Sequence, residues 1–175
     1  MKSTPRDVFM YLLCMATLYF AAFWFIRLLF ELVNTYFPDA LNPYYDPSGS
    51  LRWPIASLVI VFPVYVWLAW FLNRDIRRVP ERGEIKIRKW LVYLTLFLAA
   101  LLVIGDLVAL IYNFLGGDLT LPFFLKVGAV LAVGAAIFIY YFYDLRKTSG
   151  SFSPGAKIFV WVSIGVIALA LVAGF

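Results

Sequence analysis

The chain has 175 residues and a net charge of +5, with 64% hydrophobic residues, only 14% charged residues and a mean hydropathy of +0.90. A soluble domain carries about 25% charged residues, and the charges here stand in blocks between long apolar runs, which excludes a water-facing fold. We therefore expect one all-α membrane domain that covers residues 1–175.

Histidine is absent from the sequence, and cysteine occurs once, as Cys14. The missing histidine excludes bis-histidine haem, most zinc sites and Ser-His or Cys-His nucleophile pairs. A single cysteine excludes an intrachain disulfide and a cysteine cluster for zinc or iron–sulfur. We expect Cys14 to be a small buried side chain, and we expect neither a metal nor a cofactor.

Five apolar runs are long enough for spanning helices, which need about 20 residues each. They predict helices at about 8–36, 54–73, 90–115, 121–143 and 157–175. The first run is far longer than the apolar part of a signal peptide and lacks an Ala-x-Ala exit, so we interpret it as a mature spanning helix.

Local signals mark several of these helix ends. Thr4-Pro5-Arg6-Asp7 is typical of a capped helix start, and Ser153-Pro154 repeats the signal before the fifth helix. Gly116-Gly117 predicts the end of the third helix, and Thr120 with Pro122 predicts the start of the fourth. Pro63 is expected to bend the second helix.

The distribution of basic residues predicts the orientation of the bundle. The predicted loop after the second helix holds Arg74, Arg77, Arg78, Arg82, Lys86, Arg88 and Lys89. The loops at the opposite ends hold only Arg52, with Asp39, Asp46 and Asp118. We expect the N-terminus inside and the C-terminus outside, with the basic residues on anionic lipid headgroups. Nucleic-acid binding is the weaker interpretation, because no nucleic-acid fold accompanies the charges.

Aromatic residues fit the same orientation. Trp70, Trp90, Tyr140, Tyr141 and Tyr143 are expected at the inner interface, and Tyr36, Tyr44, Tyr45 and Trp53 at the outer one.

Charged residues interrupt the outer halves of the apolar runs. Arg27, Glu31, Asp106 and Lys126 lie within the runs, and Arg52 lies beside them. At a rise of about 1.5 Å per residue, Arg27 and Asp106 come out about 14 Å from the outer helix ends, and Glu31 and Lys126 about 8–9 Å. The matched depths predict two cross-helix pairs, Arg27 with Asp106 and Glu31 with Lys126.

Two interpretations of this intramembrane polar cluster stay open. The first is a structural ion-pair lock, with Asn34, Tyr112 and Asn113 completing its hydrogen bonds. The second is a polar cavity, open to the exterior, for an ion, a proton or an anionic ligand. A catalytic site is disfavoured, because an intramembrane aspartyl protease needs two facing aspartates and Asp106 is the only one at depth.

The predicted fourth and fifth helices are rich in small residues. Spacings such as Gly128/Ala132 and Ala170/Gly174 permit close approach of helices. We favour packing within the chain over a dimer face.

Four stretches carry a resemblance to a known family: TPRDVFMYLL, RWPIASLVIVFPVY, RKWLVYLTLFLAALLVIGDLVALIYNFLGGDLTLPFFLK and YYFYDLR. They resemble a small bacterial membrane family catalogued as domain of unknown function 5671, over about Thr4 to Arg146. The resemblance implies a bacterial inner-membrane protein and no particular activity. Arg52, Asp106, Lys126 and Asp144 fall within the matching stretches, whereas Pro122 stands where a basic residue is expected. Relatives are also expected to continue past Phe175 into a hydrophilic segment.

The sequence thus predicts a five-helix bundle of the bacterial cytoplasmic membrane that is not an enzyme and acts as a structural or accessory subunit. The expected partners are membrane lipid, other membrane subunits or a second copy of the chain, and no nucleic acid. The alternative is a small channel or transporter that uses the intramembrane polar cluster.

Overall fold

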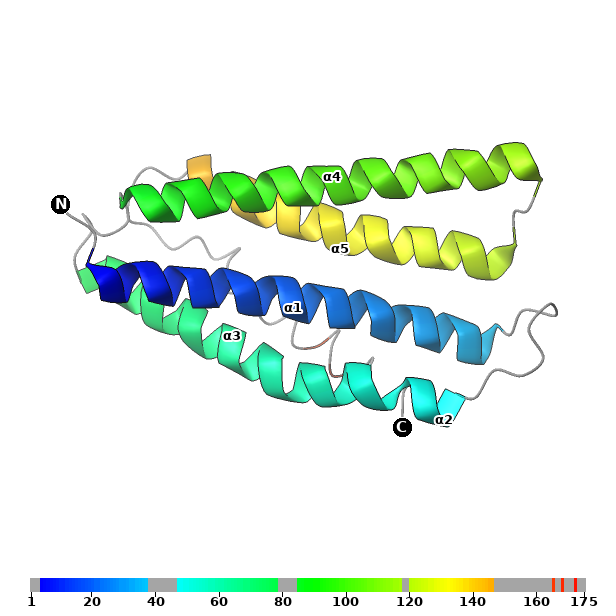
Figure 1. Ribbon diagram of the computed structural model, residues 1–175, viewed down its shortest axis with the longest axis horizontal. Helices are drawn as coiled ribbons and strands as arrows, with labels where there is room; N and C mark the ends of the chain where they lie inside the picture. Colours follow the sequence, from blue (N-terminus) through cyan, green and yellow to red (C-terminus); the bar gives the residue numbers. More distant parts are fainter. Residues whose placement is uncertain are drawn as a thin grey trace.

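The computed structural model describes residues 4–37, 47–78, 85–117 and 120–146, together with Gly165, Ala168 and Val172. In these ranges the chain is all-α, with helices α1 (Pro5–Tyr36), α2 (Pro47–Ser50), α3 (Arg52–Arg78), α4 (Lys86–Gly116) and α5 (Leu121–Arg146). All but the short α2 are long and apolar enough to cross a membrane. They run side by side along the length of the molecule (Figure 1).

Two helix ends form as their local sequence predicts. The Thr4 side chain accepts from the Asp7 backbone N–H, and the Asp7 carboxylate accepts from Thr4, which completes a capping box at the start of α1. Gly117 ends α4 in the left-handed conformation, with φ 76°, and its N–H donates to the carbonyls of Asn113 and Phe114. Pro63 lies inside α3.

The basic residues lie mostly in helices, so their assignment to a loop was wrong. Arg74, Arg77 and Arg78 belong to the end of α3, and Lys86, Arg88 and Lys89 to the start of α4. Arginine and lysine favour helices and extend their charged ends into water, so the helices continue past the apolar runs. Arg82 lies outside the described residues.

The predicted fifth helix, at 157–175, also falls largely outside the described residues. Of that stretch the structure describes only Gly165, Ala168 and Val172, each helical and exposed.

The helices pack as two antiparallel pairs joined through α1. The most extensive contacts are those of α1 with α3 and of α4 with α5, and α1 also contacts α5 and α4. α1 and α4 begin, and α3 and α5 end, at the left in Figure 1. We call this the basic end, because it holds Arg6, Arg74, Arg78, Lys86, Arg88 and Lys89.

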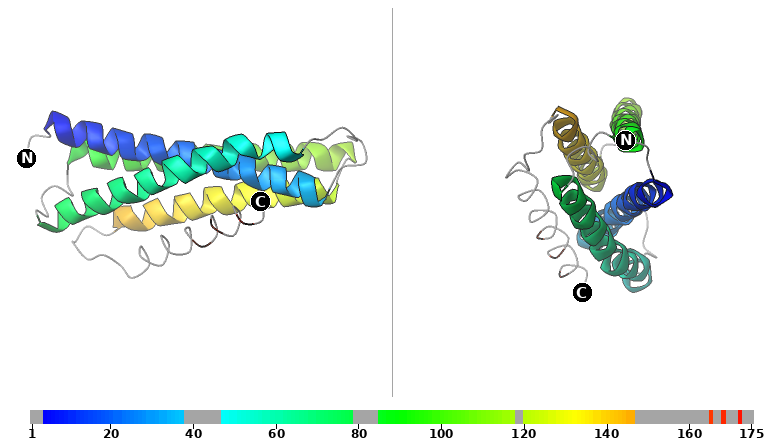
Figure 2. Two further views of the ribbon diagram at one scale, coloured as in Figure 1. Left: turned by 90° about the horizontal axis from the view of Figure 1, so that it is seen from below. Right: turned by 90° about the vertical axis from the view of Figure 1, so that its left-hand side faces the viewer.

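The buried core differs between the two ends. At the basic end all four long helices contribute, through residues such as Met15, Leu68, Val92 and Tyr141. Toward the opposite end, a second cluster is formed by α1 and α3 together with Leu51, and α5 contributes the buried residues Val127 and Val130. The buried residues of α4 are Leu91, Val92, Thr95 and Ala99, all in its basic half. All four long helices therefore share the core at the basic end, which faces the viewer in the right-hand view of Figure 2.

Close packing of α4 against α5 occurs at Gly134. A Cβ added there would lie 3.0 Å from Val103 Cγ2 and 3.2 Å from Leu102 Cδ2. The Gly128/Ala132 pair, by contrast, is exposed in the structure, and a Cβ at Gly128 would meet nothing within 4 Å. Gly128 and Ala132 lie on the outer face of α5, so they do not pack against another helix of the described chain.

Candidate functional site

The contacts between helices place the five residues of the intramembrane polar cluster at one height. Tyr19 on α1 contacts Thr95 on α4, so these two residues lie at the same height. The two helices run parallel, and counting eleven residues further along each of them places Phe30 level with Asp106. The Lys126 ammonium lies 6.0 Å from the centre of the Phe30 ring. Arg6 on α1 contacts Asp75 on the antiparallel α3. Counting 23 residues forward on α1 and 23 residues backward on α3 places Leu29 level with Arg52.

Arg27 and Glu31 flank this height within about one turn. Counting from the helix ends had instead predicted two separate heights, one for Arg27 with Asp106 and one for Glu31 with Lys126. That estimate failed because the helices end unevenly: α4 continues ten residues past Asp106, whereas α1 continues six past Phe30.

The predicted cross-helix ion pairs do not form. Arg27 Nη2 donates to Glu31 Oε1 over 3.1 Å within α1, with the two side chains 49% and 6% exposed. Asp106 Oδ2 is shielded from solvent and has no hydrogen-bond partner among the described residues. Side chains four residues apart lie on the same face of a helix, so Arg27 and Glu31 can pair whatever the position of the neighbouring helices. This pair within α1 therefore forms in place of the predicted pair of Arg27 with Asp106.

Lys126 likewise contacts the Phe30 ring where an ion pair with Glu31 was predicted. The supporting hydrogen bonds differ too. Asn113 donates to its own helix, to the Ala109 carbonyl over 2.9 Å, and Tyr112 is exposed.

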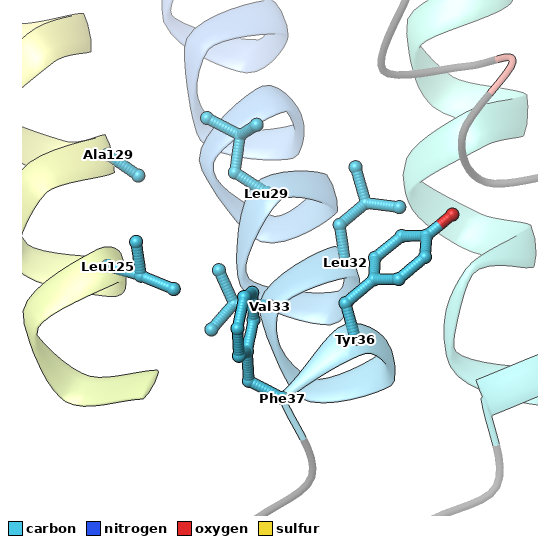
Figure 3. Close-up of a pocket in the computed structure, with 7 residues that line it drawn as sticks. All are labelled: Leu29, Leu32, Val33, Tyr36, Phe37, Leu125 and Ala129. Carbon is cyan, nitrogen blue, oxygen red and sulfur yellow. The ribbon is translucent and has the colours of Figure 1, made fainter. Parts of the chain in front are cut away.

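The groove near this height is apolar. It has a volume of about 410 Å³ and lies between α1 and α5. It is lined by Leu29, Leu32, Val33, Tyr36, Phe37, Leu125 and Ala129 (Figure 3). None of the five cluster residues lines this groove, so it is not the polar cavity that the sequence suggested.

A second set of charges links helices at the basic end. Arg6 lies 3.6 Å from Asp7 on α1 and 3.8 Å from Asp75 on α3. Arg88 on α4 donates to Asp144 on α5 over 2.5 Å. In the described ranges, an ion pair therefore joins the two members of each helix pair at this end.

Two hydroxyl contacts lie deeper in the same end. Tyr19 and Thr95 hydroxyls are 2.7 Å apart and join α1 to α4, and Thr95 also donates to the Leu91 carbonyl. The Tyr65 and Tyr141 hydroxyls, 3.5 Å apart, join α3 to α5. Tyr141 is buried, so placing it in the interfacial aromatic belt was wrong. Trp53, Trp70, Trp90 and Tyr143 are exposed, as a belt requires.

A sequence signal for one of these contacts exists. Thr95 shares the spacing of Val92 and Ala99, so it lies on the buried face of α4, where a hydroxyl needs a partner. The Tyr19–Thr95 contact was not predicted, because the predicted contacts between helices were based on charged residues.

The described residues offer little for metal or nucleophilic chemistry. Among them, no three side chains suited to a metal ion come together. Cys14 is buried, as its position in an apolar run predicted.

In the described ranges these features define an all-α bundle with four helices that are long and apolar enough to span a membrane, joined at the basic end by ion pairs and hydroxyl contacts. The family model described as "Domain of unknown function (DUF5671)" matches residues 7–141, and the chain belongs to this family. No curated protein and no solved structure matches the chain.

Proposed function

We propose that the chain is a non-catalytic structural or accessory subunit of the bacterial cytoplasmic membrane, with an apolar face that packs on another membrane helix. The observation that carries this proposal is the asymmetry of α4. Its buried residues stop at Ala99, while apolar side chains beyond it, such as Val108 and Ile111, are exposed. A helix whose buried residues all lie in one half, and whose other half exposes apolar side chains, suits an attachment role.

Crosslinking between single cysteines tests this proposal. Ile111→Cys and Tyr93→Cys, each in a Cys14→Ala background, place equally exposed probes (58% and 62%) in the two halves of α4. In native membranes, a short thiol crosslinker should give a product of discrete higher mass from position 111 and none from position 93. If position 111 gives no higher-mass product, or both positions give the same products, the attachment role is wrong.

We further propose that the bundle has five spanning helices, with 157–175 as the fifth, and that the basic end lies inside the cell. Two charged levels support a bilayer-spanning position of the bundle, and the concentration of arginine and lysine at the basic end supports its orientation. The height of Arg52, Phe30 and Lys126 lies about 35 Å from the Arg6–Asp75 contact at 1.5 Å per residue, compared with a hydrocarbon core of about 30 Å. The polar cluster then marks the outer boundary of the bilayer.

Cysteine labelling measures the orientation directly. A membrane-impermeant thiol reagent added to intact cells should label Ser48→Cys and leave Ser149→Cys protected. The reverse pattern would overturn the orientation.

The alternative function, a small channel or transporter, has one observation in its favour. The Asp106 Oδ2 atom is shielded and has no hydrogen-bond partner in the described ranges, as expected of a carboxyl that exchanges a proton or ion. Flux of protons or cations into liposomes that depends on Asp106, and not on Lys86, would favour this alternative. The apolar lining of the adjacent groove speaks against it.

A further inference from the structure

One exposed face of α3 changes from aromatic to charged toward the basic end. Trp67, Trp70, Arg74 and Arg78 follow each other at spacings of three or four residues, so they lie on the same side of the helix. All four are exposed, Trp67 by 58% and Trp70 by 55%. The described part of the chain therefore leaves this face uncovered.

The Arg74 guanidinium is held over an aromatic ring. Its central carbon lies 5.3 Å from the centre of the Trp70 ring. Contact with an indole face orients a guanidinium without neutralising it. An oriented guanidinium presents its N–H groups in a fork that matches two oxygens of a phosphate.

The carboxylates of the basic end are engaged with other groups. Asp7 caps α1 and contacts Arg6, Asp75 contacts Arg6, and Asp144 accepts from Arg88. Within the described ranges, no carboxylate lies on Arg74 or Arg78. These two arginines are therefore available to an anion from outside the described chain.

We propose that this face of α3 binds one anionic phospholipid, with the phosphate on Arg74 and Arg78 and an acyl chain along Trp70 and Trp67. The order of side chains matches such a lipid, because the charged residues lie at the helix end and the aromatic ones toward the middle of the span. Anionic headgroups attract basic residues next to a spanning helix. The site rests on the proposed membrane placement of the basic end, and it adds a specific location for one lipid and the residues that hold it.

Native mass spectrometry of the purified full chain in detergent measures this binding. Phosphatidylglycerol is titrated against the wild type, Arg74→Gln, Arg78→Gln and Lys89→Gln. Each arginine substitution should weaken the affinity about fivefold, the factor that corresponds to about 1 kcal/mol per basic residue. Lys89→Gln removes the same charge from an exposed position on α4 and should have little effect.

Two further measurements separate a site from general attraction. Trp70→Leu leaves the net charge unchanged and should still weaken binding, because the guanidinium loses its orientation. Phosphatidylcholine should bind more weakly than phosphatidylglycerol, and glycerol 3-phosphate should not displace the lipid, since it lacks the acyl chains. Unchanged melting temperatures show that the variants remain folded.

Equal weakening by Lys89→Gln and Arg74→Gln would overturn the proposal, and so would full affinity in the Trp70→Leu variant. Displacement by glycerol 3-phosphate would reduce the site to a phosphate site and overturn the lipid assignment. These measurements are made in detergent, without a partner and without a defined orientation. Their failure is therefore distinguishable from failure of the subunit role or of the topology.

Discussion

The Tyr19–Thr95 contact offers the sharpest test of the four-helix core at the basic end. Thr95 is 1% exposed, and its hydroxyl lies 2.7 Å from the Tyr19 hydroxyl, 2.8 Å from the Leu91 carbonyl and 3.5 Å from Met15 Sδ. Tyr19→Phe removes one hydroxyl and leaves Thr95 its bond to Leu91. Thr95→Val keeps the shape of the side chain and leaves the Tyr19 hydroxyl without this partner.

Hydrogen bonds between membrane helices contribute about 0.6 kcal/mol on average and up to about 1.7 kcal/mol. We expect Tyr19→Phe to cost about 0.6 kcal/mol of unfolding free energy. Thr95→Val should cost about 1–1.5 kcal/mol, because it removes a fully buried group that makes two bonds. The double variant should cost about 0.6 kcal/mol less than the sum of the two single costs.

Reversible unfolding of the purified chain in mixed detergent micelles measures these differences. Leu28→Ala provides a reference, because Leu28 is fully buried and its truncation should cost about 2–5 kcal/mol. Strict additivity of the two hydroxyl substitutions, with the Leu28→Ala cost resolved, would refute the contact. A stabilising Thr95→Val would refute the packing of α4 against α1 at this height.

Other substitutions test packing and charge elsewhere in the bundle. Gly134→Leu should lower the melting temperature, since overpacking costs about 1–3 kcal/mol and a Cβ added at this position would already lie 3.0 Å from Val103. Gly128→Leu is the matched control in open space on the same helix, and it should leave the melting temperature unchanged. Glu31→Gln should lower the free energy of unfolding by about 1 kcal/mol, and Asp106→Asn should leave it nearly unchanged, because Glu31 is the carboxylate that accepts from Arg27. Equal melting temperatures of the two variants would contradict this assignment. Asp144→Asn should cost about 0.2–1 kcal/mol through loss of the Arg88 pair, and the same loss in low and high salt would show that the effect is not electrostatic.

The features predicted best from sequence are those that depend on neighbours along the chain. The four long helices of the described ranges follow from long apolar runs, and the Thr4 cap and the Gly117 end follow from residues within one turn. A helix also continues through charged residues wherever their long side chains reach water. The apolar runs alone therefore place the end of α3 too early and the start of α4 too late.

Contacts between helices were predicted less well, because sequence gives neither the rotation nor the relative height of a helix. Arg27 and Asp106 looked equally deep when counted from helix ends, yet Arg27 bonds Glu31 on its own helix. Tyr141 has the composition of an interfacial residue, but its side of α5 faces Tyr65. A lone hydroxyl on a buried helix face, such as Thr95, was the more informative signal for interhelical pairing.

The uneven distribution of the core has a mechanical consequence. In the described ranges the hydrogen bonds and ion pairs between helices lie at the basic end, and α4 has no buried residue beyond Ala99, so α4 can pivot at the basic end as at a hinge. α4 has 31 residues and is about 46 Å long, so a rotation of roughly 5° at the hinge displaces its far tip by roughly 4 Å. Hydrogen exchange should accordingly become faster along α4 from Thr95 toward Gly116. Motion of α4 would then be greatest around Asp106 and beyond it, and least near the Tyr19–Thr95 contact.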